Sequence, residues 1–253
     1  SSGTGLWTSS GPGSASFSPG ASSAGATVTV DALGLYTFTW TETNGPCTDN
    51  NSVNVHFYQQ PLANAGPDGN ALCDSKEYTL AAIPSVGTGA WTYTGAGTAS
   101  FFPDATTAGA IVTVSNFGMY TFTWTETNVV CSDNNSVDVH FYQQPVADAG
   151  TGGNECDLDF VLNAVPSVGT GTWTWSGPGT ASFFPNANTA GATVTVNAYG
   201  AYTFTWTETN GVCSSNNSVN VHFYHQPVAH AGSGGNECDL NFVLNAVPSF
   251  GTG

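Results

Sequence analysis

Strict alternation of apolar and polar residues recurs along this chain. In residues 36–41, Tyr36, Phe38 and Trp40 alternate with threonines. Because successive side chains of a strand point to opposite faces of a sheet, this period of two predicts a β-strand with an aromatic and a threonine face. A second alternating stretch, residues 53–58, follows after a gap rich in turn-forming residues. The two stretches together predict a β-hairpin.

The same pattern returns at a fixed spacing. The segment TFTWTETN occupies residues 37–44, 121–128 and 203–210, and the tripeptide GTG begins at Gly3, Gly87, Gly169 and Gly251. These GTG starts lie 84, 82 and 82 residues apart, so the chain is a tandem array of a unit of about 82 residues. A unit of this length is large enough to bury a small core of its own.

Each unit contains about seven short alternating stretches and no helical period. In later copies the hairpin turn is predicted at Asn210-Gly211 or Asp133-Asn134, and a tryptophan recurs upstream at Trp7, Trp91 and Trp173. Short strands with turn signals between them and one large aromatic residue on the third strand are typical of an immunoglobulin-type Greek-key sandwich. The predicted fold class is therefore all-β: tandem immunoglobulin-like Greek-key β-sandwiches arranged in single file.

Proline-containing joints mark the boundaries of the units. They lie at residues 59–61, 143–145 and 225–227, each directly after a predicted strand. Such short connections, with one φ fixed by proline, predict stiff joints. The expected organisation is an incomplete immunoglobulin-like repeat that lacks its first strands, two full repeats, and the first strands of a further repeat: residues 1–61, 62–145, 146–227 and 228–253.

The charge balance excludes several functions. The chain has 17 acidic residues and one basic residue, Lys76, for a formal net charge of −16. Nucleic acid binding needs cationic side chains to replace phosphate counterions, so we exclude it, and an anionic membrane surface would repel the chain. No apolar run approaches the roughly 20 residues of a membrane helix, so direct membrane insertion is not expected.

Several segments together resemble a known kind of repeat. They are ADAG at residues 147–150, a cysteine a few residues later, PSVGTGTW at 166–173 and YTFTWTETNGVC at 202–213. The succession, which covers essentially all of the chain, resembles the immunoglobulin-like, PKD-like repeats of very long bacterial cell-surface proteins, including adhesins of gliding bacteria. The resemblance implies a secreted array attached to a cell surface and leaves the ligand open.

Six cysteines recur in step with the repeat and show no CxxC metal spacing, which favours disulfides and an oxidising, extracellular compartment. Two pairing schemes fit the repeat. Pairing within a unit joins Cys73 to Cys131 and Cys156 to Cys213, and leaves Cys47 and Cys238 to pair outside this chain. Pairing across each joint connects Cys47 to Cys73, Cys131 to Cys156 and Cys213 to Cys238. We favour the first, because closing a loop of about 57 residues would stabilise a small unit by about 4 kcal/mol.

Acidic residues suggest two kinds of site. Glu42, Glu126 and Glu208 lie at the end of the aromatic strand, and we expect them to accept hydrogen bonds from turn amides rather than to act as catalytic acids or metal ligands. Asp148, Asp157 and Asp159 near one joint suggest calcium, whose ligands are hard oxygens. The position of Asp148 holds Asn64 and His230 in other repeats, so no repeated metal site or cofactor is predicted.

Two further features concern sugars. Tyr93 and Trp175 stand where the first copy has Ser9, and they are candidates for contact with a glycan. Asn50, Asn134 and Asn216 match the Asn-x-Ser glycosylation pattern, although turn formation alone explains an Asn-Asn-Ser sequence.

No nucleophile, phosphate-binding, dinucleotide-binding or zinc-protease motif is present, so an enzyme is not expected. The prediction is a structural repeat segment of an extracellular filament or giant cell-surface adhesin that provides reach, stiffness and protease resistance. Its expected partners are itself, within a longer array or head-to-tail by strand addition, and surface glycans or other cells. Residues 228–253 are the part that residues 1–61 lack. The alternative interpretation is a repeated binding module for glycans or calcium.

Overall fold

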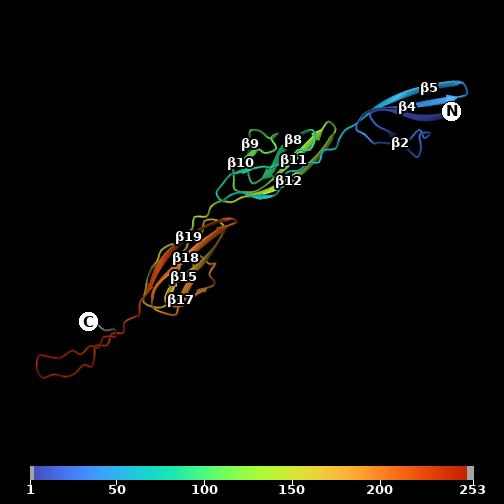
Figure 1. Ribbon diagram of the computed structural model, residues 1–253. Helices are drawn as coiled ribbons and strands as arrows, with labels where there is room; N and C mark the ends of the chain where they lie inside the picture. Colours follow the sequence, from blue (N-terminus) through green and yellow to red (C-terminus); the bar gives the residue numbers. More distant parts are fainter. Residues whose placement is uncertain (1–2, 250–253) are drawn as a thin grey trace. The chain divides into compact units, whose positions relative to one another are not determined.

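The computed structural model describes residues 3–249, which form strands and loops without a helix (Figure 1). No helix able to span a bilayer therefore occurs in this range. We refer to the four sequence segments as repeat 1, repeat 2, repeat 3 and the tail, the last being residues 228–249. The chain divides into two compact units: one comprises the residues up to 71 and residues 76–141, and the other comprises residues 72–75 and the residues from 142 onward. Each unit is described by itself.

Repeat 2 is a sandwich of two sheets. Its first sheet has the order β6-β12-β11-β8 and its second has the order β7-β10-β9. Only the β6 to β12 pairing is parallel. The seven strands are β6 (Gly69–Asn70), β7 (Glu77–Thr79), β8 (Thr88–Gly95), β9 (Ala99–Phe102), β10 (Ile111–Val114), β11 (Gly118–Asn128) and β12 (Cys131–Phe141).

Repeat 3 has the same topology, with sheets ordered β13-β19-β18-β15 and β14-β17-β16. Its strands are β13 (Gly153–Glu155), β14 (Asp159–Val161), β15 (Thr170–Ser176), β16 (Ala181–Phe184), β17 (Thr193–Val196), β18 (Gly200–Asn210) and β19 (Cys213–Phe223). Figure 1 draws the segment after β19 as a loop without strands, and no strand is assigned in the described part of the tail.

Repeat 1 is one strand short in each sheet when it is compared with the other two repeats. Its sheets have the orders β1-β4-β5 and β2-β3. The strands are β1 (Thr4–Ser10), β2 (Ala15–Ser18), β3 (Thr27–Val30), β4 (Gly34–Asn44) and β5 (Cys47–Phe57).

Two features identify the sandwich type. Trp91 on β8 and Trp173 on β15 are buried and lie next to Trp124 and Trp206 of the adjacent strand, with ring centroids 5.2 Å apart in both repeats. The hydroxyl of Tyr120 near the start of β11 donates to the carbonyl of Asn116, four residues upstream, at 3.2 Å. A buried tryptophan on the third strand and a tyrosine bonded back in this way are marks of immunoglobulin-like domains. The predicted fold class of tandem immunoglobulin-like sandwiches is confirmed.

The hairpin turn differs from one prediction. Asn128 lies opposite Cys131 and Asn210 lies opposite Cys213, so the turns contain residues 129–130 and 211–212. The turn at Asn210-Gly211 is therefore close to its predicted place, but the turn at Asp133-Asn134 is wrong. These two residues continue β12, because the long partner strand β11 offers them a complete hydrogen-bond ladder that outweighs their local turn preference.

The alternation of apolar and polar residues gives each hairpin two different faces. In repeat 2 the buried face of β11 carries Tyr120, Phe122 and Trp124, which pack with valines of β10 and β12 into the core. The opposite face is polar, and there Thr121 donates to Asp138 at 2.7 Å while Thr123 and Ser136 are hydrogen-bonded at 2.8 Å. One face thus stabilises the sandwich by burial, and the other satisfies polar side chains across the strands.

Candidate functional site

Repeat 1 leaves partly exposed several side chains that repeats 2 and 3 bury. On the second hairpin strand, Val53 is 49% exposed, whereas Val137 is 2% and Val219 is 7% exposed. Trp40 is only half-buried, although Trp124 and Trp206 at the same position are fully buried. The sequence of the hairpin is almost the same in all three repeats, so the difference arises from what covers it.

The missing cover corresponds to two strands. In repeat 2, β6 pairs with the outer edge of β12 and β7 pairs with β10. The chain around these strands buries Ala65, Ala71 and Leu80 in the core. In the part of repeat 1 that the structure describes, no strand lies on the matching edges of β5 and β3. It therefore presents two unpaired sheet edges beside an open apolar core, a combination that favours the addition of a strand.

A buried glutamate connects the entering chain to the hairpin in the complete repeats. Glu126 is 1% exposed and accepts hydrogen bonds from the backbone N–H of Ser85 at 3.0 Å and from the indole of Trp124 at 2.9 Å. It also accepts a short hydrogen bond from the Ser85 hydroxyl and one from the N–H of Val86. Glu208 has the same partners in Ser167 and Trp206. The predicted role as an acceptor for turn amides is confirmed for both.

The electrostatics of these glutamates follow from their contacts. Burial raises the pKa of Glu126, but the hydrogen bonds from the Ser85 hydroxyl, the Trp124 indole and the backbone amides outweigh it, and the net pKa is lower than the ordinary 4.5. The pKa of Glu208 is lowered for the same reasons. Both carboxylates are thus held in the charged form, as a structural acceptor requires. In repeat 1, by contrast, Glu42 is exposed and accepts a bond from the Trp40 indole at 3.1 Å.

The sequence did not reveal a second set of anchors, on the strand after the hairpin turn. The Asn135 side-chain oxygen accepts from the N–H of Ala65 at 3.0 Å, and Asn217 accepts from Ala149 at 3.1 Å. Asp133 accepts from the N–H of Ala63 at 2.9 Å. The repeated Asn-Asn-Ser sequence could have indicated these acceptors, but its local preference favours a turn. The anchors show that the strand presents polar acceptors to the chain that enters the repeat.

The tail carries apolar side chains that nothing covers. Leu244 is 81% exposed, whereas Leu162, its counterpart in repeat 3, is fully buried. The two ends of the tail nevertheless meet as they do in repeat 3: the N–H of Val247 donates to the carbonyl of His230 at 2.9 Å, and the N–H of Val228 donates to the Ser249 hydroxyl at 3.0 Å. The two ends of the tail thus meet as the ends of the corresponding segment of repeat 3 do.

The joints are held by the hairpin of the following repeat. In the first unit, the Asn128 side chain donates to the carbonyl of Gln59, and the Gln60 side chain donates to the carbonyl of Ser132, both at 2.8 Å. In the second unit the corresponding bonds, also 2.8 Å long, join Asn210 to Gln143 and Gln144 to Ser214. The joint prolines Pro61 and Pro145 are buried, but Pro227, which leads into the tail, is exposed. A joint is thus completed only when a folded hairpin follows it.

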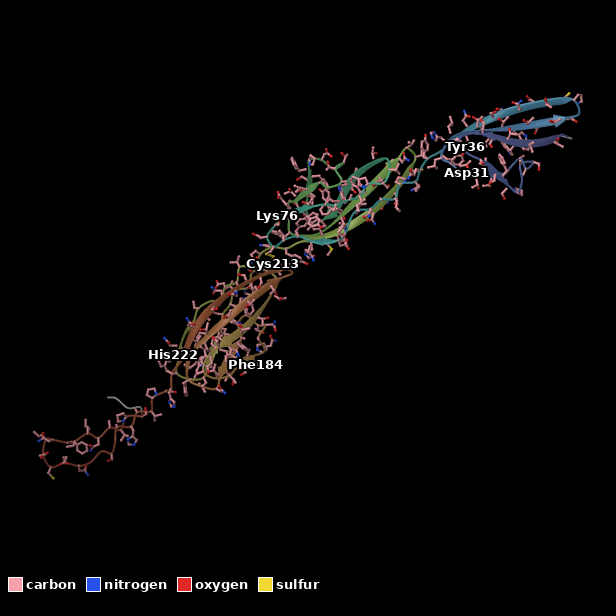
Figure 2. The ribbon with its side chains drawn as sticks, viewed as in Figure 1. Asp31, Tyr36, Lys76, Phe184, Cys213 and His222 are labelled. Carbon is pink, nitrogen blue, oxygen red and sulfur yellow. A yellow bond between two sulfur atoms is a disulfide. The ribbon has the colours of Figure 1, made fainter. Side chains whose placement is uncertain are left out.

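The disulfide differs from both predicted pairing schemes. Cys73 is bonded to Cys213, 140 residues away, with a Cα to Cα distance of 5.1 Å. The predicted bonds from Cys73 to Cys131 and from Cys156 to Cys213 are therefore wrong. The physical reason is that residues 72–75 group with repeat 3, where the N–H of Asp74 donates to the carbonyl of Tyr142 at 2.9 Å and Cys73 meets the hairpin turn. Figure 2 labels Cys213 at this turn. The other four cysteines are free in this chain: Cys47, Cys131, Cys156 and Cys238.

The remaining predicted sites are dispersed. Tyr93 and Trp175 are half-buried and pack on the cores of repeats 2 and 3, so their glycan contact stays a prediction. The acceptor asparagines Asn50, Asn134 and Asn216 are exposed, but they lie within β5, β12 and β19 rather than in a turn.

The three aspartates near one joint do not converge on a shared point. Asp148 accepts from the N–H of Gly150, Asp157 from the N–H of Asp159, and Asp159 from the hydroxyl of Thr195. Across residues 3–249 no group of three His, Cys, Asp or Glu side chains is placed to hold a metal ion. Calcium binding by these aspartates stays a prediction.

Comparisons with known proteins gave matches among solved structures alone. No family model matches the chain, and no curated protein matches it. Among solved structures, a titin I-band fragment I67-I69 is 13% identical with a TM-score of 0.42, and covers 88% of each chain. The immunoglobulin domains 1-4 of Sidekick-1 are 12% identical over 88% of this chain and 68% of theirs, with a TM-score of 0.44. Extracellular domains 3-5 of Drosophila OTK are 14% identical over 76% and 71%, with a TM-score of 0.43. The chain is similar to arrays of immunoglobulin-like domains.

Proposed function

We propose that this chain is a non-catalytic building block of an extracellular filament, in which the tail of one copy completes repeat 1 of the next. The observation that carries the proposal is the pair of complementary defects in one chain. Within the described residues, each sheet of repeat 1 has one strand fewer than in repeats 2 and 3, and the tail has the side chains of those two strands outside any sheet.

The sequence of the tail supports the match. Residues 227–253 repeat residues 145–171 with four differences: His230 for Asp148, Ser233 for Thr151, Asn241 for Asp159 and Phe250 for Val168. Residues 145–171 are the segment that supplies β13 and β14 to repeat 3. The tail therefore has the sequence of a segment that completes this type of sandwich.

The register of the donated strands follows from repeat 3. There Gly153 lies opposite Val221 in the parallel pair, and Phe160 lies opposite Val194 in the antiparallel pair. Transferred by position, Gly235 of the tail would lie opposite Val55 of β5, and Phe242 would lie opposite Val28 of β3. Leu244 would then occupy the core position of Leu162, and Ser249 would reach Glu42.

The energetic direction is favourable. Donation would cover the half-exposed Val53, remove Leu244 from water and pair two open strand edges. Burial of one large aliphatic side chain contributes about 1.5–3 kcal/mol, so covering several of them favours donation.

An extracellular location and a mechanical role fit the remaining chemistry. A disulfide closes the joint of repeats 2 and 3, and disulfides persist in oxidising compartments. Lys76 is the only basic side chain, and its ammonium group donates to the carbonyl of Ser115 at 2.8 Å, so trypsin-like proteases have little to attack. We propose that assembly provides reach, stiffness and protease resistance at a cell surface.

Two adjacent tail positions provide the test. In repeat 3, Leu162 is buried but its neighbour Val161 is 64% exposed. Leu244→Asp should therefore abolish assembly, whereas Val243→Asp adds the same charge at a position that stays in solvent. Electron microscopy and light scattering of the purified full chain should show filaments for wild type and Val243→Asp, and single copies for Leu244→Asp. Wild-type protein that remains monomeric, or filaments of Leu244→Asp, would overturn strand donation.

A further inference from the structure

The bond from Cys73 to Cys213 defines a rule for the array. It joins residues 72–75, which we call the entrance loop of repeat 2, to the hairpin turn of repeat 3, where Cys213 lies opposite Asn210. The entrance loop is held there by the hydrogen bond from Asp74 to Tyr142. The hairpin cysteines of the other repeats occupy the same position: Cys47 and Cys131 face Asn44 and Asn128 across the equivalent hairpin turn.

The four free cysteines fall into two matching classes. Cys47 and Cys131 are hairpin cysteines that lack an entrance loop from a preceding repeat. Cys156 and Cys238 are entrance-loop cysteines that lack the hairpin of a following repeat. Within one copy, the rule therefore leaves these four without partners and pairs Cys73 with Cys213 alone.

Around Cys131 there is space for the missing loop. A cavity of about 540 Å³ in the first unit is lined by residues of β3 and the following loop, by His56, Phe57 and Tyr58, and by Val130 and Cys131. Tyr58 and Cys131 correspond to Tyr142 and Cys213, between which residues 72–75 lie in the second unit. The first unit thus has the receptor for an entrance loop, with a free thiol in its wall.

We infer that each head-to-tail junction is closed by two disulfides, from Cys156 to the partner's Cys47 and from Cys238 to the partner's Cys131. The inference rests on the proposed strand donation. When the tail of one copy completes repeat 1 of its partner, that repeat follows repeat 3, so its hairpin meets the loop of Cys156. The donated tail brings Cys238 to the cavity at Cys131. All six cysteines are then bonded by one rule.

The chemistry requires a named oxidant. In each bond two thiols lose two protons and two electrons, and a sulfur–sulfur bond forms. The electrons reduce a small-molecule or protein disulfide to two thiols by exchange through a mixed disulfide. Both entrance-loop cysteines are exposed, so such an exchange partner can reach them.

Peptide mapping tests the pairing directly. Full-length protein, as an equal mixture of ¹⁴N-labelled and ¹⁵N-labelled copies, is assembled with oxidised glutathione, alkylated and digested without reductant. We expect the pairs Cys156 with Cys47 and Cys238 with Cys131 as peptides of mixed label, together with the pair Cys73 with Cys213 in unmixed label. Filaments in which the four thiols are alkylated, or bonds from Cys47 to Cys131 or from Cys156 to Cys238, would overturn the inference.

Serine variants separate this inference from the proposed function. Cys47→Ser/Cys131→Ser removes both partners at each junction, so it should still form filaments by strand addition but run as single chains in non-reducing SDS gels. Cys73→Ser/Cys213→Ser is the matched control and should retain the SDS-resistant ladder. A ladder that persists in the first variant contradicts the disulfide rule, whereas the absence of filaments in wild type contradicts strand donation.

Discussion

At the scale of single residues, Glu126 and Glu42 form a natural comparison. Glu126 is buried and accepts from Ser85, Val86 and Trp124, whereas Glu42 is exposed and accepts from Trp40. Since hydrogen bonds to a charged acceptor contribute about 1.5–3 kcal/mol each, Glu126→Gln should lower the free energy of opening of repeat 2 by about 2–4 kcal/mol. Glu42→Gln in the unassembled protein should change repeat 1 by less than about 0.5 kcal/mol. Hydrogen exchange of each repeat measures both, and equal losses would contradict the assigned contacts.

The same carboxylates make stability depend on pH. The pKa values of Glu126 and Glu208 are lower in the folded chain than the ordinary 4.5. The charged form is thus favoured by folding, so its contribution is complete above about pH 4.5 and is lost as the pH falls through the folded-state pKa. Acid unfolding followed by tryptophan fluorescence should therefore show declining stability below about pH 4.5. The variant Glu126→Gln/Glu208→Gln should have a flatter profile, and an unchanged profile would exclude these groups as its source.

Val129 is another position at which one residue matters. It has a φ of 58° at the first turn position of its hairpin, where repeats 1 and 3 have Gly45 and Gly211. A left-handed conformation costs a side chain with a Cβ about 1–2 kcal/mol, so Val129→Gly should stabilise repeat 2 by about 1 kcal/mol.

The reverse change provides the control for this turn. A Cβ at Gly45 would meet no atom within 4 Å, so Gly45→Ala isolates the cost of the φ of 60° and should destabilise repeat 1. Hydrogen exchange of the two hairpins gives both values. Destabilisation by Val129→Gly would show that the valine side chain has a contact that outweighs its strain.

At the scale of elements, the entrance loop and the hairpin are held together by one bond that trypsin can report. Cleavage after Lys76 in denaturant gives two fragments, with Cys73 in the first and Cys213 in the second. Without reductant, unassembled wild type and unassembled Cys131→Ser, whose junction cysteines are still thiols, should keep the fragments joined, and unassembled Cys213→Ser should release them. If Cys131→Ser released the two fragments instead, the result would support the bond from Cys73 to Cys131 within repeat 2. Electrophoresis of the three proteins decides between them.

Alternation predicted the strands well, because a period of two places the apolar side chains on the one face that packs on the core. Tyr120, Phe122 and Trp124 pack as their period of two requires, and Glu126 accepts the expected turn amides. Local turn preference failed at Asp133 and Asn134, where the ladder of a long partner strand decides the conformation. The disulfide was not predictable from loop closure, since the position of residues 72–75 beside the next hairpin is a tertiary contact that no local pattern reports.

At the scale of the whole molecule, the proposed filament depends on a match between the open edges of repeat 1 and the tail. Repeat 1 has open edges on β5 and β3, and the tail carries the sequence that fills the same edges in repeat 3. The joints also depend on the repeat that follows, because Gln59 and Gln143 accept hydrogen bonds from the hairpin after each joint. Strand donation would supply both the missing strands of repeat 1 and a hairpin after the last joint.

The most direct measurement is a cryo-electron microscopy map of filaments assembled from the purified full chain. The account predicts density for a fourth strand along β5 and a third strand along β3 of every repeat 1, with the side chains of the tail and with Phe242 opposite Val28. It also predicts that this density continues into repeat 3 of the neighbouring copy. Contacts between copies that leave both edges of repeat 1 uncovered, or added strands whose side chains do not match the tail, would contradict it.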